Sequence, residues 1–333
     1  MTEKIVLVPG DGIGKEIAES VKEVSAVLTP AITWVPHEAG AEYYEQHGAL
    51  FDPSLLEDIK HTGVCIKGPT ATPVGTGFRS INVQLRQAFH TNINLRPVHS
   101  LPGVNSRYED VDIVIFRENS EDLYKGVEYM YDRDTAHGIK IISKEASANI
   151  ITASFEYARK HHRHKVTCVH KANIMKLTDG LFLHTFEDIA KQYPDIESNA
   201  VIIDAFCMKV VTDPTQFDVI VTENLYGDIL SDLCAGLVGG LGFAPSANIG
   251  KDVRIYEAVH GSAPDIAGKD IANPTAILMA YSMCLKDLGY VKEAVTLDTT
   301  LNDIFMEGKV LTQDLKGTAT TTQFTQEILR RLG

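Results

Sequence analysis

Short apolar segments recur along this chain, and several of them end in charged or polar side chains. The segments "VIFREN", "VTCVHKAN", "VIIDAF" and "VIVTENLYGD" are each a β-rich run that ends in this way, and amphipathic stretches typical of helices lie between such runs. Alternation of this kind is typical of an α/β protein whose strands are largely parallel. Because open α/β sheets bind ligands beyond the carboxyl ends of their strands, these endings predict one shared site.

Length, charge and cysteine usage limit the class of protein further. A chain of 333 residues can bury a large core and suits two domains. The formal net charge of −13 argues against nucleic acid as a partner, although a local arginine cluster can still bind small anions. The five cysteines are scattered, with no C-x-x-C pair, which predicts buried thiols in a reducing compartment, and so a cytoplasmic location, rather than a disulfide framework or a zinc site. No apolar run reaches about 18 residues and no leader-like segment is visible, so we expect no membrane association.

One stretch interrupts the alternation of strands and helices. Residues 125–143, "KGVEYMYDRDTAHGIKIIS", contain two short strand-like runs on either side of a polar turn. This pattern predicts a hairpin, which we expect to protrude from the rest of the fold.

Two aspartates in "NLYGDILSDLCAG" suggest a cation site. Asp228 and Asp232 are four residues apart, so on a helix their carboxylates share one face. Mg²⁺ and Mn²⁺ favour such oxygen ligands and keep further positions for water or substrate. Asp204, at the end of "AVIID", would be a third acid. The alternative is a solvated acidic face without a bound ion.

Arginines gather in two of the motifs. Arg86 and Arg96 lie in "INVQLRQAFHTNINLRP", and Arg117 lies in "VIFREN". Arginine binds carboxylates through two parallel hydrogen bonds, so several arginines in an acidic protein predict a small polyanionic substrate. The alternative is that each arginine pairs with one of the 44 acidic residues.

A lysine and a tyrosine are candidates for proton transfer. Lys171 follows the strand-like run "KVTCVH", and a partly buried lysine can act as a base or proton relay. Tyr124, in "RENSEDLY", could donate a proton. The alternatives are an exposed lysine and a tyrosine that only packs.

The segment "EAVHGSAPDIAGKDIANPTA" is rich in small residues and proline, with His260, Asp265 and Asn273 among them. Such a loop lets its backbone approach a ligand closely. Asn273 and Pro274 are typical of the start of a helix.

Together these motifs resemble the isocitrate/isopropylmalate dehydrogenase family of β-decarboxylating dehydrogenases. The resemblance runs nearly end to end, through "GDGIG", "KGP", "LRP", "REN", "HKAN", "NLYGDILSD" and "VHGSAPDIAGKDIANPTA". It implies two α/β domains, with a mixed central sheet in the large domain, and not a Rossmann fold. The large domain would comprise residues 1–96 and 241–333. The small domain would comprise residues 97–240, with the dimer interface and an intersubunit clasp at about 122–143.

The family oxidises a 2-hydroxy acid that carries a 3-carboxylate and then releases that carboxylate as CO₂. Its members differ in the third substituent of the substrate. Ser80 and Asn82, in "FRSINVQLR", resemble the residues that hydrogen-bond the γ-carboxylate in isocitrate dehydrogenases. A site built to make hydrogen bonds rejects an isopropyl group. The resemblance therefore implies oxidation of isocitrate to 2-oxoglutarate through oxalosuccinate, with homoisocitrate or another 3-substituted malate as the alternative substrate.

The resemblance also implies roles for the other candidates. Arg86, Arg96 and Arg117 would hold the α- and β-carboxylates of the tricarboxylate. Lys171 would help to take the proton of the C2 hydroxyl, and Tyr124 would protonate C3 of the enolate formed after CO₂ leaves. The ligands of a Mg²⁺ or Mn²⁺ ion would be Asp204, Asp228 and Asp232.

In this family Lys171 and Asp204 act in the site of the second subunit, so the resemblance implies a homodimer. A less favoured alternative is a non-catalytic regulatory subunit, but such relatives usually lose catalytic residues, and this chain keeps them. One departure is "HTNINLRP", in which His90, Thr91 and Asn92 stand where many relatives have Asp-Leu-Tyr.

The resemblance also indicates the cofactor. NADP-using relatives often carry Lys-Tyr where this chain has Asp265 and Ile266. An aspartate can accept hydrogen bonds from both ribose hydroxyls and repels a 2′-phosphate, so we expect NAD. The residues expected at the cofactor are Thr72, Asn173, His260, Gly261, Ala263, Asp265, Ile266 and Asn273.

The opening "VLVPGDGIGKEI" has the outline of a dinucleotide fingerprint, but its spacing differs. The glycines follow G-x-G-x-G, and the segment from Thr29 to Pro36 holds no acid that could bind a ribose. We therefore expect this turn to shape the first strand-to-helix connection beside the cofactor cleft. The residues that select NAD would lie much later, in "HGSAPDIAG".

Overall fold

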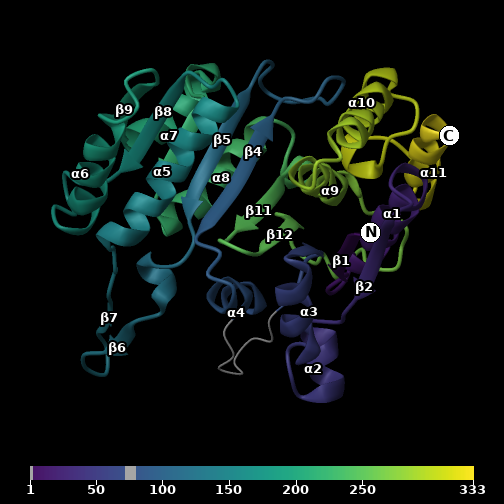
Figure 1. The fold of residues 1–333 in the computed structure, drawn as a ribbon, viewed down its shortest axis with the longest axis horizontal. Coiled ribbons are helices and arrows are strands. Elements are labelled where there is room, and N and C mark those ends of the chain that lie inside the picture. Colours follow the sequence, from purple (N-terminus) through teal and green to yellow (C-terminus); the bar gives the residue numbers. More distant parts are fainter. Residues whose placement is uncertain (1–2, 72–79) are drawn as a thin grey trace. The chain divides into compact units, whose positions relative to one another are not determined.

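The computed structural model describes residues 3–71 and 80–333. The chain divides into two compact units, the first made of residues 1–89, 101–107 and 239–333 and the second of residues 90–100 and 108–238. In the described residues each unit contains strands of a β-sheet with helices packed against them (Figure 1). The predicted mixed α/β fold class is confirmed. The predicted boundary at residues 96/97 falls inside a strand, Ile93–His99, which belongs whole to the second unit because it pairs along its length with Asp112–Glu118.

In the first unit the strands lie in the order β2-β1-β3-β12-β11, and only β11 runs antiparallel to its neighbour β12. The strands of this unit are β1 (Glu3–Val8), β2 (Ile32–Pro36), β3 (Val64–Lys67), β11 (Pro245–Ile249) and β12 (Arg254–Ala258). The helices are α1 (Gly14–Leu28), α2 (Ala41–His47), α3 (Ser54–Thr62), α4 (Ile81–Ala88), α9 (Thr275–Asp287), α10 (Val291–Glu307) and α11 (Thr321–Leu332). Short 3₁₀ turns occupy η3 (Leu241–Phe243) and η4 (Gln313–Leu315).

Both faces of this sheet are covered, as the continuous apolar strands require. In β1, Val6 and Val8 belong to one core cluster with Leu55 and Ile59 of α3. Side chains alternate along a strand, so the other residues of β1 face the opposite side of the sheet. There α9 packs against β12 and β11, while α1 packs against α9 and α11. Burial on both faces explains why these strands read as unbroken apolar runs.

The glycine-rich turn after β1 is locked by close backbone contacts. Gly10 and Gly12 both have positive φ angles, of 78° and 58°. A Cβ atom on Gly12 would lie 2.0 Å from the carbonyl oxygen of Ser262. The backbone N–H of Ile13 donates to that same oxygen at 3.0 Å. The turn thus forms the connection from β1 to α1 and supports the loop that follows β12.

In the second unit the strands lie in the order β4-β5-β10-β8-β9, and only β4 runs antiparallel to its neighbour β5. The strands are β4 (Ile93–His99), β5 (Asp112–Glu118), β8 (Lys165–His170), β9 (Glu197–Ile202) and β10 (Val219–Thr222). The helices are α5 (Lys144–Lys160), α6 (Thr178–Ala190), α7 (Ile203–Thr212) and α8 (Asn224–Leu237), with 3₁₀ turns at η1 (Asp122–Lys125) and η2 (Pro214–Gln216).

The helices of this unit are sorted onto the two faces of its sheet. One face is covered by α5 and α6, and the other is covered by α7 and α8. On the second face, Phe206 of α7 and Leu230 of α8 share a buried cluster with Ile113, Ile115 and Ile220 of the strands. This packing fixes α8 over the sheet, with its first turn at the carboxyl ends of β5 and β10.

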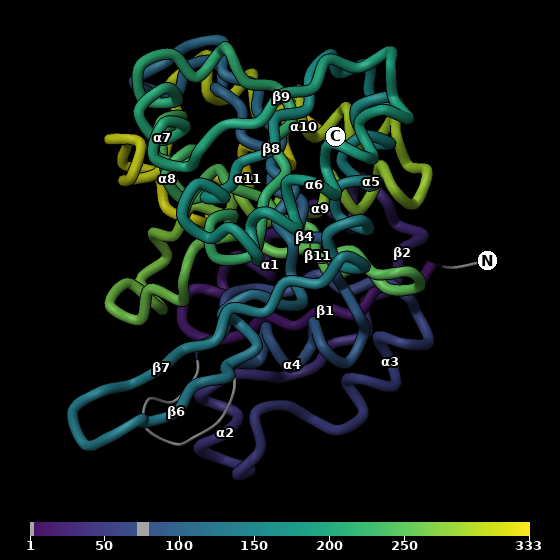
Figure 2. Tube along the Cα trace, turned by 90° about the vertical axis from the view of Figure 1, so that its left-hand side faces the viewer, coloured from purple at the N-terminus to yellow at the C-terminus, as the bar shows by residue number. Residues whose placement is uncertain are grey.

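The predicted hairpin is present as two short strands, β6 (Glu128–Met130) and β7 (Ala136–Gly138), paired antiparallel. It projects from the body of the second unit as a long loop (Figure 2). All residues of both strands are exposed, and Met130 and Tyr131 leave 61% and 68% of their surface open.

Two further expectations can be compared with the structure. All five cysteines are free thiols, and four of them are buried as predicted, whereas Cys207 is only partly buried. Among the described residues, no helix combines the length and the apolar character needed to cross a bilayer.

Candidate functional site

Two arginines and two aspartates meet at the carboxyl end of β5 in the second unit. Asn94 of β4 lies opposite Arg117 of β5, which brings Arg96 two residues further along the same pair of strands. The guanidinium of Arg117 forms an ion pair with Asp228 of α8. Arg96 lies 3.6 Å from the same carboxylate and 3.4 Å from Asp232, measured from its terminal nitrogens. Two of the three predicted substrate arginines and two of the three predicted metal aspartates therefore form one cluster.

Neutral side chains hold the arginines in this cluster. Asn224 accepts hydrogen bonds through Oδ1 from Nε and Nη2 of Arg117, at 3.0 and 2.8 Å. Asn94 accepts from Nε of Arg96 at 2.7 Å, and Ser231 accepts from its Nη1. Arg117 is only 1% exposed, so these bonds replace the water that a guanidinium would otherwise bind.

The residues that orient the arginines were not predicted from the sequence. Asn224 precedes Asp228 by one helical turn, so the i, i+4 rule that paired the aspartates would also have put Asn224 on their face. Gly227 is required for a steric reason, because a Cβ atom there would lie 2.5 Å from Cγ of Arg117. The motif "NLYGD" thus serves Arg117 in three ways. Asn224 accepts its hydrogen bonds, Gly227 leaves room for its side chain, and Asp228 pairs with its charge.

Tyr124 lies in η1 and joins the same cluster. Its hydroxyl donates to Oδ2 of Asp228 at 2.5 Å, and its ring centroid lies 5.0 Å from the guanidinium carbon of Arg117. Burial and the bond to Asp228 raise the pKa of Tyr124, so its phenol keeps its proton at neutral pH. Asp122 anchors η1 to α8 by accepting from the backbone N–H of Leu225 at 2.8 Å.

The aspartate pair has the chemistry of a divalent-cation site. The side chains of Asp228 and Asp232 remain 39% and 55% exposed, so both carboxylates can be reached from solvent. Burial raises the pKa of Asp232, and the charges of Arg96 and Arg117 oppose that rise. Two accessible carboxylates on one helix face are hard oxygen ligands of the kind that Mg²⁺ and Mn²⁺ bind.

The third predicted metal ligand lies elsewhere in the same unit. Asp204, in the first turn of α7, forms an ion pair with Lys171, which follows β8. The hydrogen bond from Lys171 lowers the pKa of Asp204. Within residues 3–71 and 80–333, no group of three or more His, Cys, Asp or Glu side chains could hold a metal ion. One chain therefore presents two separate groups of candidate residues. Asn173 lies in the exposed loop after Lys171.

The altered segment before Arg96 packs against the "REN" motif. Thr91 is fully buried, and its carbonyl accepts from the side-chain amide of Asn119 at 3.0 Å. The carbonyl of Asn92 accepts from the backbone N–H of the same residue, also at 3.0 Å. His90 has a φ angle of 50°, which turns the chain into this segment. His90, Thr91 and Asn92 thus connect β4 to the end of β5.

The other predicted substrate residues belong to the first unit. Ser80 lies at the start of α4, and Asn82 and Arg86 are one turn apart on it. Oδ1 of Asn82 is buried and has no hydrogen-bond partner among the described residues.

A buried ion pair near Arg86 was not predicted. Lys67, in the "KGP" motif, lies 2.8 Å from Glu257 of β12, and both are almost fully buried. Burial alone would raise the pKa of Glu257, but the charges of Lys67 and Arg86 hold it at about 2. Asn248 donates to the other oxygen of this carboxylate at 2.7 Å. The pair could have been suspected from the sequence only because Lys67 ends an apolar strand-like run, as the other candidate residues do.

The residues predicted to bind the cofactor lie mainly in the loop between β12 and α9. Nε2 of His260 is buried without a partner among the described residues, and burial lowers the pKa of this imidazole, which is therefore neutral. Asp265 is exposed. Asn273 accepts from the backbone N–H of Thr275 at 3.0 Å, so the helix begins where the sequence predicted. The other predicted residues of this loop are Gly261, Ala263 and Ile266, whereas Thr72 lies outside the described residues.

This loop has features that fit an adenine nucleotide. A buried imidazole nitrogen without a partner among the described residues and an exposed carboxylate are the groups that a base and a ribose would bind. Two hydrogen bonds fix the loop to the start of α1. The backbone N–H of Ile13 donates to the carbonyl of Ser262, and the backbone N–H of Gly268 donates to the carboxylate of Glu16.

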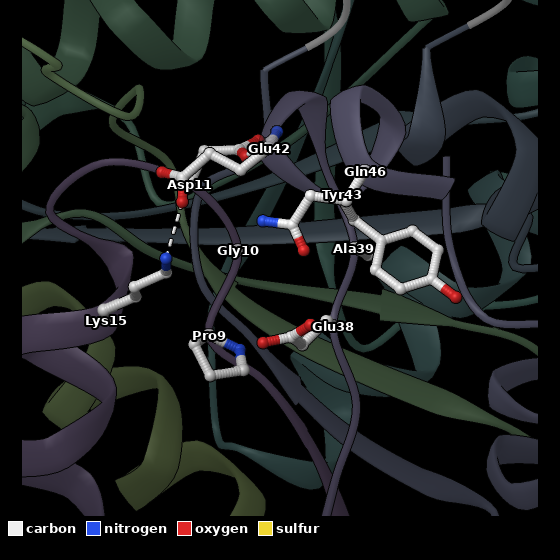
Figure 3. Close-up of a pocket in the computed structure, with 9 residues that line it drawn as sticks. All are labelled: Pro9, Gly10, Asp11, Lys15, Glu38, Ala39, Glu42, Tyr43 and Gln46. Carbon is white, nitrogen blue, oxygen red and sulfur yellow. Dashed lines mark hydrogen bonds and ion pairs between the residues drawn. The ribbon is translucent and has the colours of Figure 1, made fainter. Parts of the chain in front are cut away.

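A small pocket of about 140 Å³ lies between the glycine-rich turn and α2, and residues of both line it (Figure 3). Three of its lining residues are acidic, Asp11, Glu38 and Glu42, and its one cation, Lys15, is paired with Glu42 at 2.5 Å. Such a lining repels a pyrophosphate. The geometry therefore gives no support to a phosphate-binding role for this turn on the side of α2.

Comparison with known proteins gives a consistent result. Residues 4–328 match the sequence model of the family described as isocitrate/isopropylmalate dehydrogenase. An Arabidopsis thaliana protein named isocitrate dehydrogenase [NAD] catalytic subunit 5, mitochondrial, is 48% identical over 98% of this chain and 87% of its own length. A Dictyostelium discoideum protein, named as a regulatory subunit of mitochondrial isocitrate dehydrogenase [NAD], is 45% identical over 99% of this chain and 92% of its own.

A solved structure leads to the same family. The crystal structure of isocitrate dehydrogenase from Methylococcus capsulatus matches this chain with a TM-score of 0.95 and 44% identity, over 99% of both chains. The match of the family model over almost the whole length, together with these relatives, establishes that the chain belongs to the isocitrate/isopropylmalate dehydrogenase family.

Proposed function

We propose that this protein catalyses the NAD-dependent and divalent-metal-dependent oxidative decarboxylation of isocitrate to 2-oxoglutarate and CO₂, through oxalosuccinate. The observation that carries the proposal is the cluster of Arg96, Arg117, Tyr124, Asp228 and Asp232. It combines two cations for carboxylates, two carboxylates for a metal ion and a protonated phenol. Asp228 contacts both arginines and the phenol, and Asp232 joins the cluster through Arg96.

Substrate binding is assigned to the charged and amide side chains. Arg96 and Arg117 would bind substrate carboxylates together with Arg86, because a guanidinium matches a carboxylate with two hydrogen bonds. Ser80 and Asn82 would hydrogen-bond the γ-carboxylate through the serine hydroxyl and the side-chain NH₂ of the asparagine, which are the groups that can donate to an ionised carboxylate. Asp228 and Asp232 would hold the divalent ion, which would supply Lewis-acid polarisation of the C2 oxygen, and the loop between β12 and α9 would hold NAD as the hydride acceptor.

Proton transfer is assigned to two residues. Lys171, held by Asp204, would take the proton of the C2 hydroxyl in the site of the partner chain, and the exposed position of this pair supports such a role. Tyr124 would give its proton to C3 of the enolate that remains after CO₂ leaves. The raised pKa of its phenol supports a donor that is protonated before the reaction.

Assembly is part of the same proposal. A homodimer would join the Lys171–Asp204 pair of one chain to the Asp228–Asp232 pair of the other, which lack a third acid among the described residues of one chain. The protein from Dictyostelium discoideum is named as regulatory, so a regulatory role in a larger assembly is the second candidate. The cytoplasmic location stays a prediction, and the Arabidopsis and Dictyostelium relatives are named as mitochondrial.

The deciding experiment is steady-state kinetics on the purified chain alone. We expect turnover with isocitrate, NAD and Mg²⁺ or Mn²⁺, with kcat/KM higher than for homoisocitrate or isopropylmalate. Preference for either of the other substrates would refute the role of Ser80 and Asn82. Activity that appears only after a second, different chain is added would favour the regulatory candidate.

Cofactor choice has its own test. The double substitution Asp265→Lys and Ile266→Tyr replaces the group proposed to bind the ribose with one that attracts a 2′-phosphate. We expect the ratio of kcat/KM for NAD to that for NADP to fall by about 100-fold or more, from the loss of a charged hydrogen bond and the gain of a cation. Unchanged discrimination would show that this loop does not select the cofactor.

A further inference from the structure

A buried lysine with two acidic partners lies between the two groups of candidate residues in the second unit. Lys140 follows β7, in the segment that returns from the hairpin. Its ammonium lies 2.5 Å from Oδ1 of Asp179, in the first turn of α6, and 2.6 Å from Oε2 of Glu223, which directly precedes α8. The side chains of Lys140, Asp179 and Glu223 are 10%, 0% and 1% exposed. We call these three residues the buried triad.

Each acid of the triad holds a segment that carries candidate catalytic groups. The second oxygen of Asp179 accepts the backbone N–H of Lys171 at 2.7 Å. Glu223 is followed by Asn224, which orients Arg117, and its own carbonyl accepts the backbone N–H of Gly227. One ammonium therefore reaches both the backbone of Lys171 and the first turn of α8.

The segment around Lys140 is also tied to η1, which carries Tyr124. The backbone N–H of Asp122 donates to the carbonyl of Ile141 at 2.8 Å, and that of Ser143 donates to Glu121 at 2.6 Å. The ring of Tyr226 covers the ammonium at 4.5 Å from its centroid. Lys140 is thus fixed from several elements, as a rigid linking group must be.

Burial of these three ionisable side chains has an unfavourable desolvation free energy, so the triad needs an explanation other than stability. An ammonium and two carboxyl groups in a region without solvent lose favourable hydration, and replacing buried ion clusters by apolar side chains is often neutral or stabilising. Oε1 of Glu223 is buried and has no hydrogen-bond partner among the described residues. Stability alone therefore does not explain the triad.

We propose that Lys140 is a positioning residue, and that its ammonium, shared by Asp179 and Glu223, holds the backbone of Lys171 and the first turn of α8 in one fixed relation. The inference rests on the proposed function for the roles of Lys171 and Arg117. It adds that the groups a chain uses in its own site and those it gives to its partner are held together through a charge that contacts neither substrate nor cofactor.

Hydrogen exchange measured by mass spectrometry tests this inference without any assay of activity. In Lys140→Met we expect backbone amides in peptides covering residues 171–176 and 223–228 to exchange at least five-fold faster than in the unmodified protein. Lys165→Met is the matched control, because Lys165 forms an ion pair with Glu197 at 3.1 Å at the other end of β8. We expect the control to leave both peptides unchanged.

Kinetics and conservative substitutions separate positioning from general stability. We expect kcat with isocitrate and NAD to fall at least ten-fold in Lys140→Met and to recover to within about three-fold in Lys140→Arg, which keeps the charge and its donors. If Lys140→Met does not fold, Asp179→Asn replaces it, and we expect faster exchange over residues 171–176.

Three results would overturn the inference. They are unchanged exchange over residues 171–176, faster exchange spread evenly over the second unit, or a loss of kcat that Lys140→Arg does not restore. Failure of the proposed function would look different, because the unmodified protein would not turn over isocitrate while the exchange results would still decide the role of Lys140.

Discussion

The arginine–aspartate cluster and the Lys171–Asp204 pair are built in opposite ways. In the cluster, Arg117 is 1% exposed, and it is held by Asn224 and by Asp228. In the pair, the side chain of Asp204 is 70% exposed and its partner is a single lysine. The cluster is organised in advance by one chain, whereas the pair is open and available to another molecule. This difference agrees with the proposal that the cluster binds the substrate and that the Lys171–Asp204 pair acts in the site of a partner chain.

We expect the largest loss of activity from a substitution in the buried arginine–aspartate cluster. Arg117→Lys removes the two hydrogen bonds to Asn224 and shortens the reach to Asp228, so we expect kcat/KM for isocitrate to fall by about 10³-fold or more. The matched control is Arg159→Lys, because Arg159 makes an exposed ion pair with Asp195 in the same unit. A loss of less than ten-fold in Arg117→Lys, measured beside an unaffected control, would contradict the role of Arg117.

The exposed pair should separate catalysis from stability. We expect Lys171→Met to lower kcat by about 10²- to 10³-fold, which is typical for loss of a proton-transfer group. Because exposed ion pairs contribute little to folding, the same variant should keep the melting temperature within a few degrees of the unmodified protein.

A mixing experiment makes this part of the comparison sharper. Dimers formed from Lys171→Met and Arg117→Lys chains should regain part of the activity, because one of the two sites would combine intact groups from both chains. If activity stays absent after mixing, the assignment of Lys171 to the partner's site is wrong.

Tyr124 belongs to the buried cluster but acts in a single step of the proposed reaction. Tyr124→Phe keeps the ring beside Arg117 and removes the hydroxyl that donates to Asp228. We expect oxidative decarboxylation of isocitrate to fall by about 100-fold, while the reduction of supplied oxalosuccinate falls much less. Equal losses in the two assays would indicate that the hydroxyl organises the cluster and donates no proton.

The sequence predicted the charged residues of the two groups, but it did not predict the neighbouring residues that hold them in place. The apolar runs and the i, i+4 spacing of Asp228 and Asp232 were sufficient to place these carboxylates at the end of parallel strands. Arg117 lies at one of the predicted strand endings, whereas Arg96 lies within β4 and was predicted only from the gathering of arginines in an acidic chain. The spacing could not reveal that Asn224 and Gly227 serve Arg117, because that contact joins residues about 110 positions apart and depends on how α8 crosses β5.

Other features could not be predicted for a related reason. Burial of a charge is a property of the packed fold, so Lys140, Asp179 and Glu223 read as ordinary surface residues in the sequence. The glycine-rich opening shows the opposite case, in which the spacing of the glycines was enough to set aside a dinucleotide fingerprint and to predict a strand-to-helix turn. The structure shows Gly10 and Gly12 packed against backbone carbonyls and acidic side chains lining the pocket beside them.

The smallest expected effect concerns stability, and it tests the link between the two regions. Burial, opposed by Lys140 and reinforced by Asp179 and Asp122, raises the pKa of Glu223 to about 8. A carboxyl with a raised pKa holds its proton in the folded state where the unfolded chain has lost it. Its contribution to stability is therefore present at acid pH and is lost as pH rises from about 5 to about 8, by at most about 1.4 kcal/mol per pH unit.

Glu223→Gln removes this titration while it keeps the shape of the side chain. We expect the free energy of unfolding of the variant, measured by urea denaturation, to equal that of the unmodified protein near pH 5 and to exceed it increasingly towards pH 8. Burial lowers the pKa of His170 and His260, which changes stability with pH in the opposite sense, but both proteins share these groups and the difference between them cancels. A difference that stays constant across this range would mean that Glu223 is ionised throughout. The ammonium of Lys140 would then lie between two ionised carboxylates. The triad would be held by two ion pairs, and not by one ion pair with Asp179 and a hydrogen bond to a protonated Glu223.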